Sequence, residues 1–233
     1  MRILATLLIA GALAFSCLAA EKAKDDDAQV KLLLSGRELL TNNRPLDAIS
    51  QSFDKVIRQF ETEFDSKEKR VYCARSPEEA LFYMAIAAND KQSASVIGPT
   101  WSDAHYLKAY ALMEVERISE AQDSLKRALE LSPQNSMYLG ELAYTYQVQR
   151  NWAESLATFK EAEEAADLTS PEDQKVPDRT RALRGQGFSL VELGMLDEAE
   201  AKYREAIAAD PADRASKGEI QYIQELRARE KPD

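Results

Sequence analysis

The sequence has very few of the residues on which most enzyme sites depend. Its one histidine, His105, has no second histidine with which to bind a metal or to build a catalytic triad. The eight glycines are scattered, so the sequence has no glycine-rich phosphate loop. Acidic residues are plentiful, yet nothing in the sequence singles out two of them for acid–base chemistry. We therefore predict a protein that is not an enzyme and that uses no cofactor and no metal.

Cysteine and positive charge are also scarce. The two cysteines are Cys17 and Cys73, and if Cys17 is lost with an N-terminal signal, no disulfide can form within the chain. We expect Cys73 to be a buried packing residue. Lysine and arginine number 30 against 40 acidic residues, which gives a net charge of −10. Such a chain repels phosphate backbones and anionic lipid, so neither nucleic acid nor a membrane surface is an expected partner.

The N-terminus has the order of a secretory signal peptide. Arg2 is followed by a largely apolar run from Ile3 to Phe15 that contains no charged residue, and small residues precede Glu21. We predict a signal peptide over 1–20, a charged leader over 21–29 and an exported, periplasmic protein. Two alternatives stay open: an uncleaved anchor helix, and lipidation at Cys17. The residues before Cys17 depart from the usual lipoprotein signal because a phenylalanine lies among them.

Beyond the signal, apolar residues recur at a fixed offset. In the column formed by Ala109, Ala143 and Gly187, the residue number rises first by 34 and then by 44. The same two steps separate the members of three further columns: Leu112, Tyr146 and Leu190; Leu125, Phe159 and Tyr203; and Ala128, Ala162 and Ala206. A period of about 34 residues is typical of a helix–turn–helix unit that must stack on copies of itself to bury its apolar face. We therefore predict an all-α solenoid of antiparallel helix pairs.

The register assigns a domain organisation. A helical region with degenerate repeats is expected over 30–101. Within it, residues 68–101 are expected to form a unit of the same stack. The helix that begins at about 77 is expected to continue through Ala94 to Ile97. Full repeats should cover 102–135, 136–169 and 180–213. Residues 170–179, with Pro171 and Pro177 among them, are expected to form a surface insertion loop. A capping helix and tail should cover 214–233.

The ends of these units resemble the tetratricopeptide repeat (TPR) family, in its exported bacterial form. The segments 128–133 and 206–211 both end in proline like the end of such a repeat, and 193–199 resembles the turn between its two helices. The resemblance implies a right-handed stack whose first helices line a concave, peptide-binding groove. One variant of the family clamps a C-terminal carboxylate with Lys and Asn at set groove positions. This chain has Tyr106 and Tyr110 at those positions, so we expect this clamp to be absent.

The resemblance also places particular side chains in the groove. The predicted groove residues are Tyr106, Tyr110, Met113, Tyr144, Gln147, Arg181, Arg184 and Phe188. Aromatic rings supply large contact area at low entropic cost, and the two arginines, a turn apart, are suited to a carboxylate. The alternatives are that the aromatic rings belong to the core and that the arginines are a solvated face.

Two functions remain. The first is an exported, non-enzymatic adaptor whose groove binds a peptide segment of an envelope or secretion-machinery protein. The second is a structural subunit of a homo-oligomer or envelope complex, which associates through its N-terminal helices or the ends of the solenoid; the phenylalanine-rich segment 46–64 motivates it. The oligomeric state itself is left open.

Overall fold

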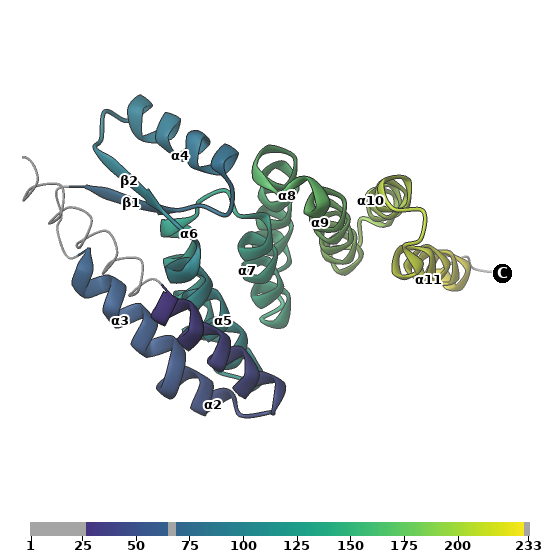
Figure 1. Cartoon of the computed structure of the whole chain (residues 1–233). Coiled ribbons are helices and arrows are strands. Elements are labelled where there is room, and N and C mark those ends of the chain that lie inside the picture. The colour runs from purple at the N-terminus through teal and green to yellow at the C-terminus, as the bar shows by residue number, and fades with distance from the viewer. Residues whose placement is uncertain (1–26, 65–68, 231–233) are drawn as a thin grey trace, which may run out of the picture.

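The computed structural model describes residues 27–64 and 69–230. The predicted signal peptide, most of the charged leader and Cys17 lie outside the described residues. The chain is a stack of helix pairs with one small mixed insertion (Figure 1). The predicted all-α solenoid is therefore confirmed. Among the helices of 27–64 and 69–230, none is long and apolar enough to cross a bilayer.

Three helix pairs and a last helix form the C-terminal part of the stack. Their bounds are α5 (Thr100–Glu114) with α6 (Ile118–Leu131), α7 (Ser136–Val148) with α8 (Trp152–Thr169), α9 (Glu172–Glu192) with α10 (Leu196–Ala209), and α11 (Arg214–Glu230). In the last pair, a small residue of the first helix faces a large residue of the second. A Cβ on Gly187 would lie 2.7 Å from the ring of Tyr203, so only glycine allows this approach.

The turns inside the pairs share one backbone feature. Glu116, Arg150 and Gly194 each adopt a positive φ, of 60°, 60° and 76°, seven residues after the small residue of their unit. Asn43 adopts a φ of 56° seven residues after Gly36. This left-handed residue lets the chain reverse directly after the first helix. The shared position indicates that residues 27–63 form a helix pair in the same register.

This N-terminal pair consists of a helix over 27–41 and a second helix that runs through α2 (Pro45–Ala48), the π-helical η1 (Ile49–Phe53) and α3 (Asp54–Glu63). Residues 27–29 of the predicted leader thus already belong to a helix. The second helix buries Phe53, Val56 and Phe60 in one core cluster with residues of α5. The pair therefore stacks directly on the first full repeat.

Residues 68–101 do not form the predicted helical unit of the stack. They contain β1 (Arg70–Cys73), α4 (Pro77–Asn89) and β2 (Ala94–Ile97), with the two strands parallel. The expectation that the helix continues through Ala94 to Ile97 was wrong, because Lys91 adopts a left-handed turn and the β-branched pair Val96-Ile97 favours a strand. This βαβ insertion packs on the stack: Ser132 Oγ donates to Cys73 O at 2.7 Å and Arg75 Nη2 to Thr169 O at 3.3 Å.

The predicted loop over 170–179 is also corrected. Helix α8 extends to Thr169 and α9 begins at Glu172, so the ten additional residues lengthen both helices across the turn. Pro177 lies inside α9, where it removes one backbone donor near the helix start without ending the helix. Ser170 Oγ donates to Asp178 Oδ2 at 2.6 Å and fastens the turn to the second turn of α9.

Candidate functional site

The first helix of each C-terminal unit exposes one aromatic ring. Tyr110 on α5, Tyr144 on α7, Phe188 on α9 and Tyr222 on α11 have 44%, 46%, 39% and 46% of their surface exposed. Their spacing repeats the register of the small-residue column, so they occupy the same position in successive first helices. Within residues 27–64 and 69–230 no other aromatic side chain is exposed. We call these four residues the aromatic ladder.

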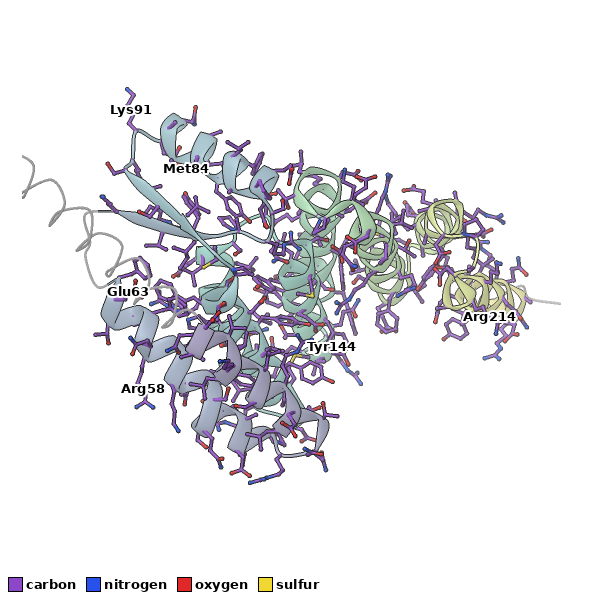
Figure 2. All side chains as sticks on the ribbon, in the orientation of Figure 1. Arg58, Glu63, Met84, Lys91, Tyr144 and Arg214 are labelled. Carbon is purple, nitrogen blue, oxygen red and sulfur yellow. The ribbon has the colours of Figure 1, made fainter. Side chains whose placement is uncertain are left out.

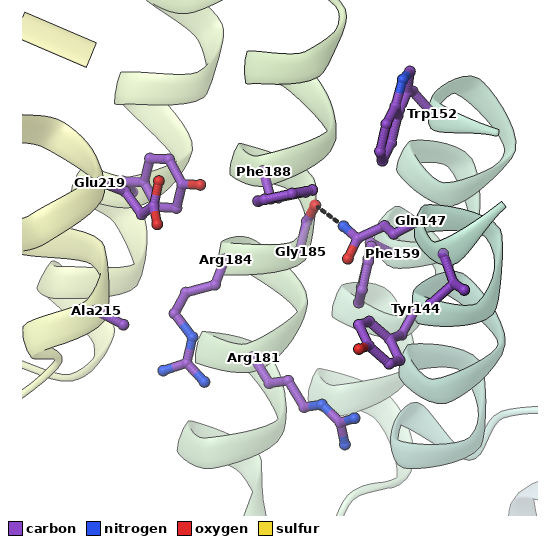
Figure 3. Close-up of a pocket in the computed structure, with 12 residues that line it drawn as sticks. Tyr144, Gln147, Trp152, Phe159, Arg181, Arg184, Gly185, Phe188, Ala215 and Glu219 are labelled. Carbon is purple, nitrogen blue, oxygen red and sulfur yellow. Dashed lines mark hydrogen bonds between the residues drawn. The ribbon is translucent and has the colours of Figure 1, made fainter. Parts of the chain in front are cut away.

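Two hollows lie along this ladder and share a wall. The first, about 790 Å³, is bordered by Tyr110, Met113 and Tyr144 between α5 and α7. The second, about 510 Å³, lies between α7, α9 and α11, and its lining includes Tyr144 and Phe188 (Figure 3). Because Tyr144, Val148 and Arg181 line both, the hollows form one continuous groove. Figure 2 shows Tyr144 on the side of the stack away from α4, where Met84 and Lys91 lie.

Phe188 is placed by an edge contact rather than by the core. Its ring lies 6.0 Å, centroid to centroid, from the ring of Trp152 at an interplanar angle of 63°. Met113 packs partly against the N-terminal core cluster while still lining the first hollow. Tyr110, Tyr144 and Phe188 therefore keep exposed ring surface that a ligand can contact.

Tyr106 has the opposite role. Its ring stacks on Tyr138 with centroids 5.2 Å apart, and the side chain is only partly accessible. Burial, and to a smaller extent the charge of Glu141, raises the pKa of its hydroxyl to about 12. Tyr106 is thus a packing residue between α5 and α7, and it lines neither hollow.

The two predicted groove arginines are neutralised by carboxylates of the same chain. Arg181 pairs with Glu141 of α7, and Arg184 Nη1 lies 3.2 Å from Asp213 Oδ1. Burial by itself would raise the pKa of Asp213, but a hydrogen bond from Ser216 and the charge of Arg184 hold it below its usual value. These pairs connect α9 to its neighbours on either side. Each arginine therefore already has a carboxylate partner within the chain, although both side chains also line the second hollow.

Gln147 is likewise used inside the fold. Its Nε2 donates to Gly185 O at 3.1 Å (Figure 3). It also donates to Ser189 Oγ at 3.1 Å, and so joins α7 to α9. Of the predicted groove residues, the structure leaves Tyr110, Met113, Tyr144 and Phe188 accessible along the hollows and engages the other four in contacts within the chain. Sequence reasoning missed Tyr222, although it follows Phe188 at the period of the repeat, a signal that would have found it.

His105 is buried in α5, with 7% of its surface exposed. Burial, followed by the charges of Lys108 and Arg127, lowers its pKa to about 3, so the imidazole is neutral near pH 7. Within the described ranges, no cluster of three or more His, Cys, Asp or Glu side chains is suited to hold a metal ion. Cys73 is free and buried, and burial raises the pKa of its thiol to about 12.

Comparison with known proteins agrees with this architecture. The tetratricopeptide repeat family matches residues 106–171 and 141–214. Among solved structures, PilF of Pseudomonas aeruginosa is 13% identical over 88% of this chain and 71% of that chain, with a TM-score of 0.59. MamA of Desulfovibrio magneticus RS-1 is 12% identical over 86% of both chains, with a TM-score of 0.55. Identities this low establish the fold alone. A comparison with curated protein sequences gives no match.

Proposed function

Because residues 106–214 belong to the tetratricopeptide repeat family, whose members are generally non-enzymatic interaction modules, we propose that this protein is an adaptor that binds a peptide segment of a partner protein in its concave groove. The observation that carries the proposal is the aromatic ladder. Its four rings are exposed at one position of successive first helices, and three of them line two adjoining hollows. Half-exposed aromatic rings supply contact area, and little conformational entropy is lost when a peptide covers them.

The ladder is tested by replacing Tyr110 and Tyr144 with alanine in one variant. Exposed positions change stability by only about 0.5–1 kcal/mol each, so the variant should fold and unfold much like the wild type. Light crosslinking in the native envelope, followed by purification, should recover a partner with the wild type and lose it with the variant. Leu81→Ala is the control, because Leu81 on α4 is 72% exposed and lies outside both hollows.

Two results would refute the groove assignment. Recovery of the same partners by the wild type and by the double variant would place the working surface elsewhere. A loss of several kcal/mol in the free energy of unfolding would show that the two tyrosines belong to the core.

We further propose that the protein works outside the cytoplasm, with an envelope or secretion-machinery protein as its partner. The apolar run from Ile3 to Phe15 supports export. Mass spectrometry of the protein recovered from a periplasmic fraction should give a mature chain that begins near Glu21. A chain that begins at a lipid-modified Cys17, or one that keeps residues 1–20 in the membrane fraction, would support one of the anchored alternatives instead.

The alternative of a structural subunit that associates through its N-terminal helices has lost the feature that motivated it. Phe53, Val56 and Phe60 bury their side chains against α5 within the chain, so this apolar face is already covered. Deleting residues 21–66 would remove part of the core of the first repeat. The observations therefore favour the adaptor over association through the N-terminal helices.

A further inference from the structure

The charges along the groove indicate the kind of ligand it accepts. Both groove arginines are paired with carboxylates of the chain itself. Glu114, Glu116 and Glu219 also line the hollows, and none of the three forms a salt bridge with another residue of the described part of the chain. A ligand rich in carboxylates would meet uncompensated negative charge, whereas lysine or arginine side chains would be attracted.

The spacing of the ladder indicates the conformation of the ligand. Of the first helices, α7 and α9 pack against each other and are joined by the hydrogen bond from Gln147 to Gly185 O. Packed helices lie about 8–10 Å apart. A polyproline II segment returns to the same side every three residues, or about 9.3 Å. A β-strand returns every two residues, or about 6.8 Å, and so drifts out of register with the rings. Residues three positions apart in a polyproline II segment can therefore meet two rings of the ladder, those of Tyr144 on α7 and Phe188 on α9.

The polar groups of the ladder suit the same ligand. Three of its four members, Tyr110, Tyr144 and Tyr222, carry a hydroxyl that can donate a hydrogen bond. A polyproline II segment has no internal hydrogen bonds, and proline has no N–H, so its backbone presents mainly carbonyl acceptors. Proline-rich segments also dock in grooves that are lined by aromatic side chains.

We propose that the groove binds a cationic, proline-rich peptide segment in the polyproline II conformation, with apolar residues on the aromatic ladder and lysine or arginine residues beside Glu114, Glu116 and Glu219. This inference rests on the proposed groove function and specifies its ligand. The segment requires no carboxylate terminus, because the arginines that would bind one are already paired.

The test uses three blocked synthetic peptides titrated into the purified protein and followed by calorimetry. They are (Pro-Pro-Lys)4, (Pro-Pro-Glu)4, which reverses the charge, and (Gly-Ser-Lys)4, which keeps the charge but is flexible. We expect (Pro-Pro-Lys)4 to bind, and each of the others to bind at least about tenfold more weakly. Tyr110→Ala and Tyr144→Ala should each weaken binding of (Pro-Pro-Lys)4 about fivefold or more, while Leu81→Ala should leave it unchanged.

Three outcomes would overturn the inference. Equal affinity for (Gly-Ser-Lys)4 would show that charge alone is recognised, and equal affinity for (Pro-Pro-Glu)4 would show that the glutamates play no part. No binding of (Pro-Pro-Lys)4, together with a crosslinked partner that is lost in the Tyr110 and Tyr144 double variant, would refute this ligand class. That last combination would leave the groove function itself standing, so the two failures are distinguishable.

Discussion

The burial of His105 predicts a specific loss of stability below neutral pH. Its imidazole lies in α5, near the charges of Lys108 and Arg127, with Asp54 of α3 as the opposing acidic group. Burial is the largest cause that lowers its pKa from 6.5 to about 3, and the two cations add to it. Between these values the unfolded chain takes up a proton that the native state does not bind. The free energy of unfolding must therefore fall as the pH falls through this range.

The magnitude follows from the pKa shift. One pKa unit corresponds to about 1.4 kcal/mol, so moving from about pH 7.5 to about pH 5.0 should cost the native state about 2 kcal/mol through His105 alone. That corresponds to about a 30-fold change in the folding equilibrium constant. The loss should continue toward a pH of about 3, where the native imidazole also becomes protonated.

The assay is urea unfolding of the wild type and of His105→Gln at both pH values. The glutamine side chain does not titrate, and the carboxylates common to both proteins cancel in the comparison. We expect the stability difference between the two proteins to change by about 2 kcal/mol from neutral to acidic pH. Because the chain has a single histidine, its imidazole NMR signal reports directly on the native state. A native titration midpoint near the ordinary histidine value, or parallel pH profiles for the two proteins, would refute the reasoning.

Two further predictions concern the packing that positions the groove. Gly185→Ala should lower the free energy of unfolding by about 1–3 kcal/mol, since the added Cβ would lie 2.3 Å from Cζ of the buried Phe159. Gly218→Ala is the control, because a Cβ at Gly218 would have no neighbour within 4 Å. In the same urea titration this control should raise the free energy of unfolding by about 0.5–1 kcal/mol. Glu79→Gln should lower the free energy of unfolding by about 3 kcal/mol, because it leaves the largely buried guanidinium of Arg75, 3.0 Å away, without its counter-charge. A thermal midpoint within about 1 °C of the wild type would contradict this prediction.

The sequence predicted the stack because its packing depends on residue size at fixed positions. Gly187 must be small to accept the ring of Tyr203, so the repeat of small and large residues is visible without coordinates. The N-terminal unit was harder to place for a physical reason. Its turn requires a left-handed residue, which Asn43 supplies where later units use Glu116, Arg150 or Gly194. Because the conformation is shared and the residue type is not, the register of this unit is seen only in the structure.

The βαβ insertion escaped sequence reasoning because its strands are short. β1 and β2 have four residues each, too few for an alternating pattern to distinguish a strand from a helix. Pro133 also follows Pro99 at the period of the repeat, so the insertion imitates one more unit. The predicted start of the helix at about 77 is correct, and Ser76 caps it: its side chain accepts a hydrogen bond from the N–H of Glu79 at 3.2 Å.

In the groove, too, some features follow from the repeat of the sequence and others are seen only in the structure. The exposed rings could be predicted because they repeat. The pairing of Arg181 and Arg184 could not, because their carboxylates come from outside α9, 40 and 29 residues away in the chain. These partners reverse the inference about charge: two arginines that suggested a site for an anion belong to a groove whose unpaired charges are acidic.

The aromatic ladder is better explained by binding than by stability. Every other aromatic side chain in the described part of the chain is at least partly buried, so this sequence is able to cover its rings. The members of the ladder keep 39–46% of their surface exposed, and one of them lies on the last helix, α11, where a cap that serves solubility alone would present polar groups. Exposing apolar surface costs about 25 cal/mol per Å² relative to burying it. An aromatic ring is nevertheless exposed at the same position of successive first helices, beside two adjoining hollows. This repeated exposure indicates a surface that a ligand covers.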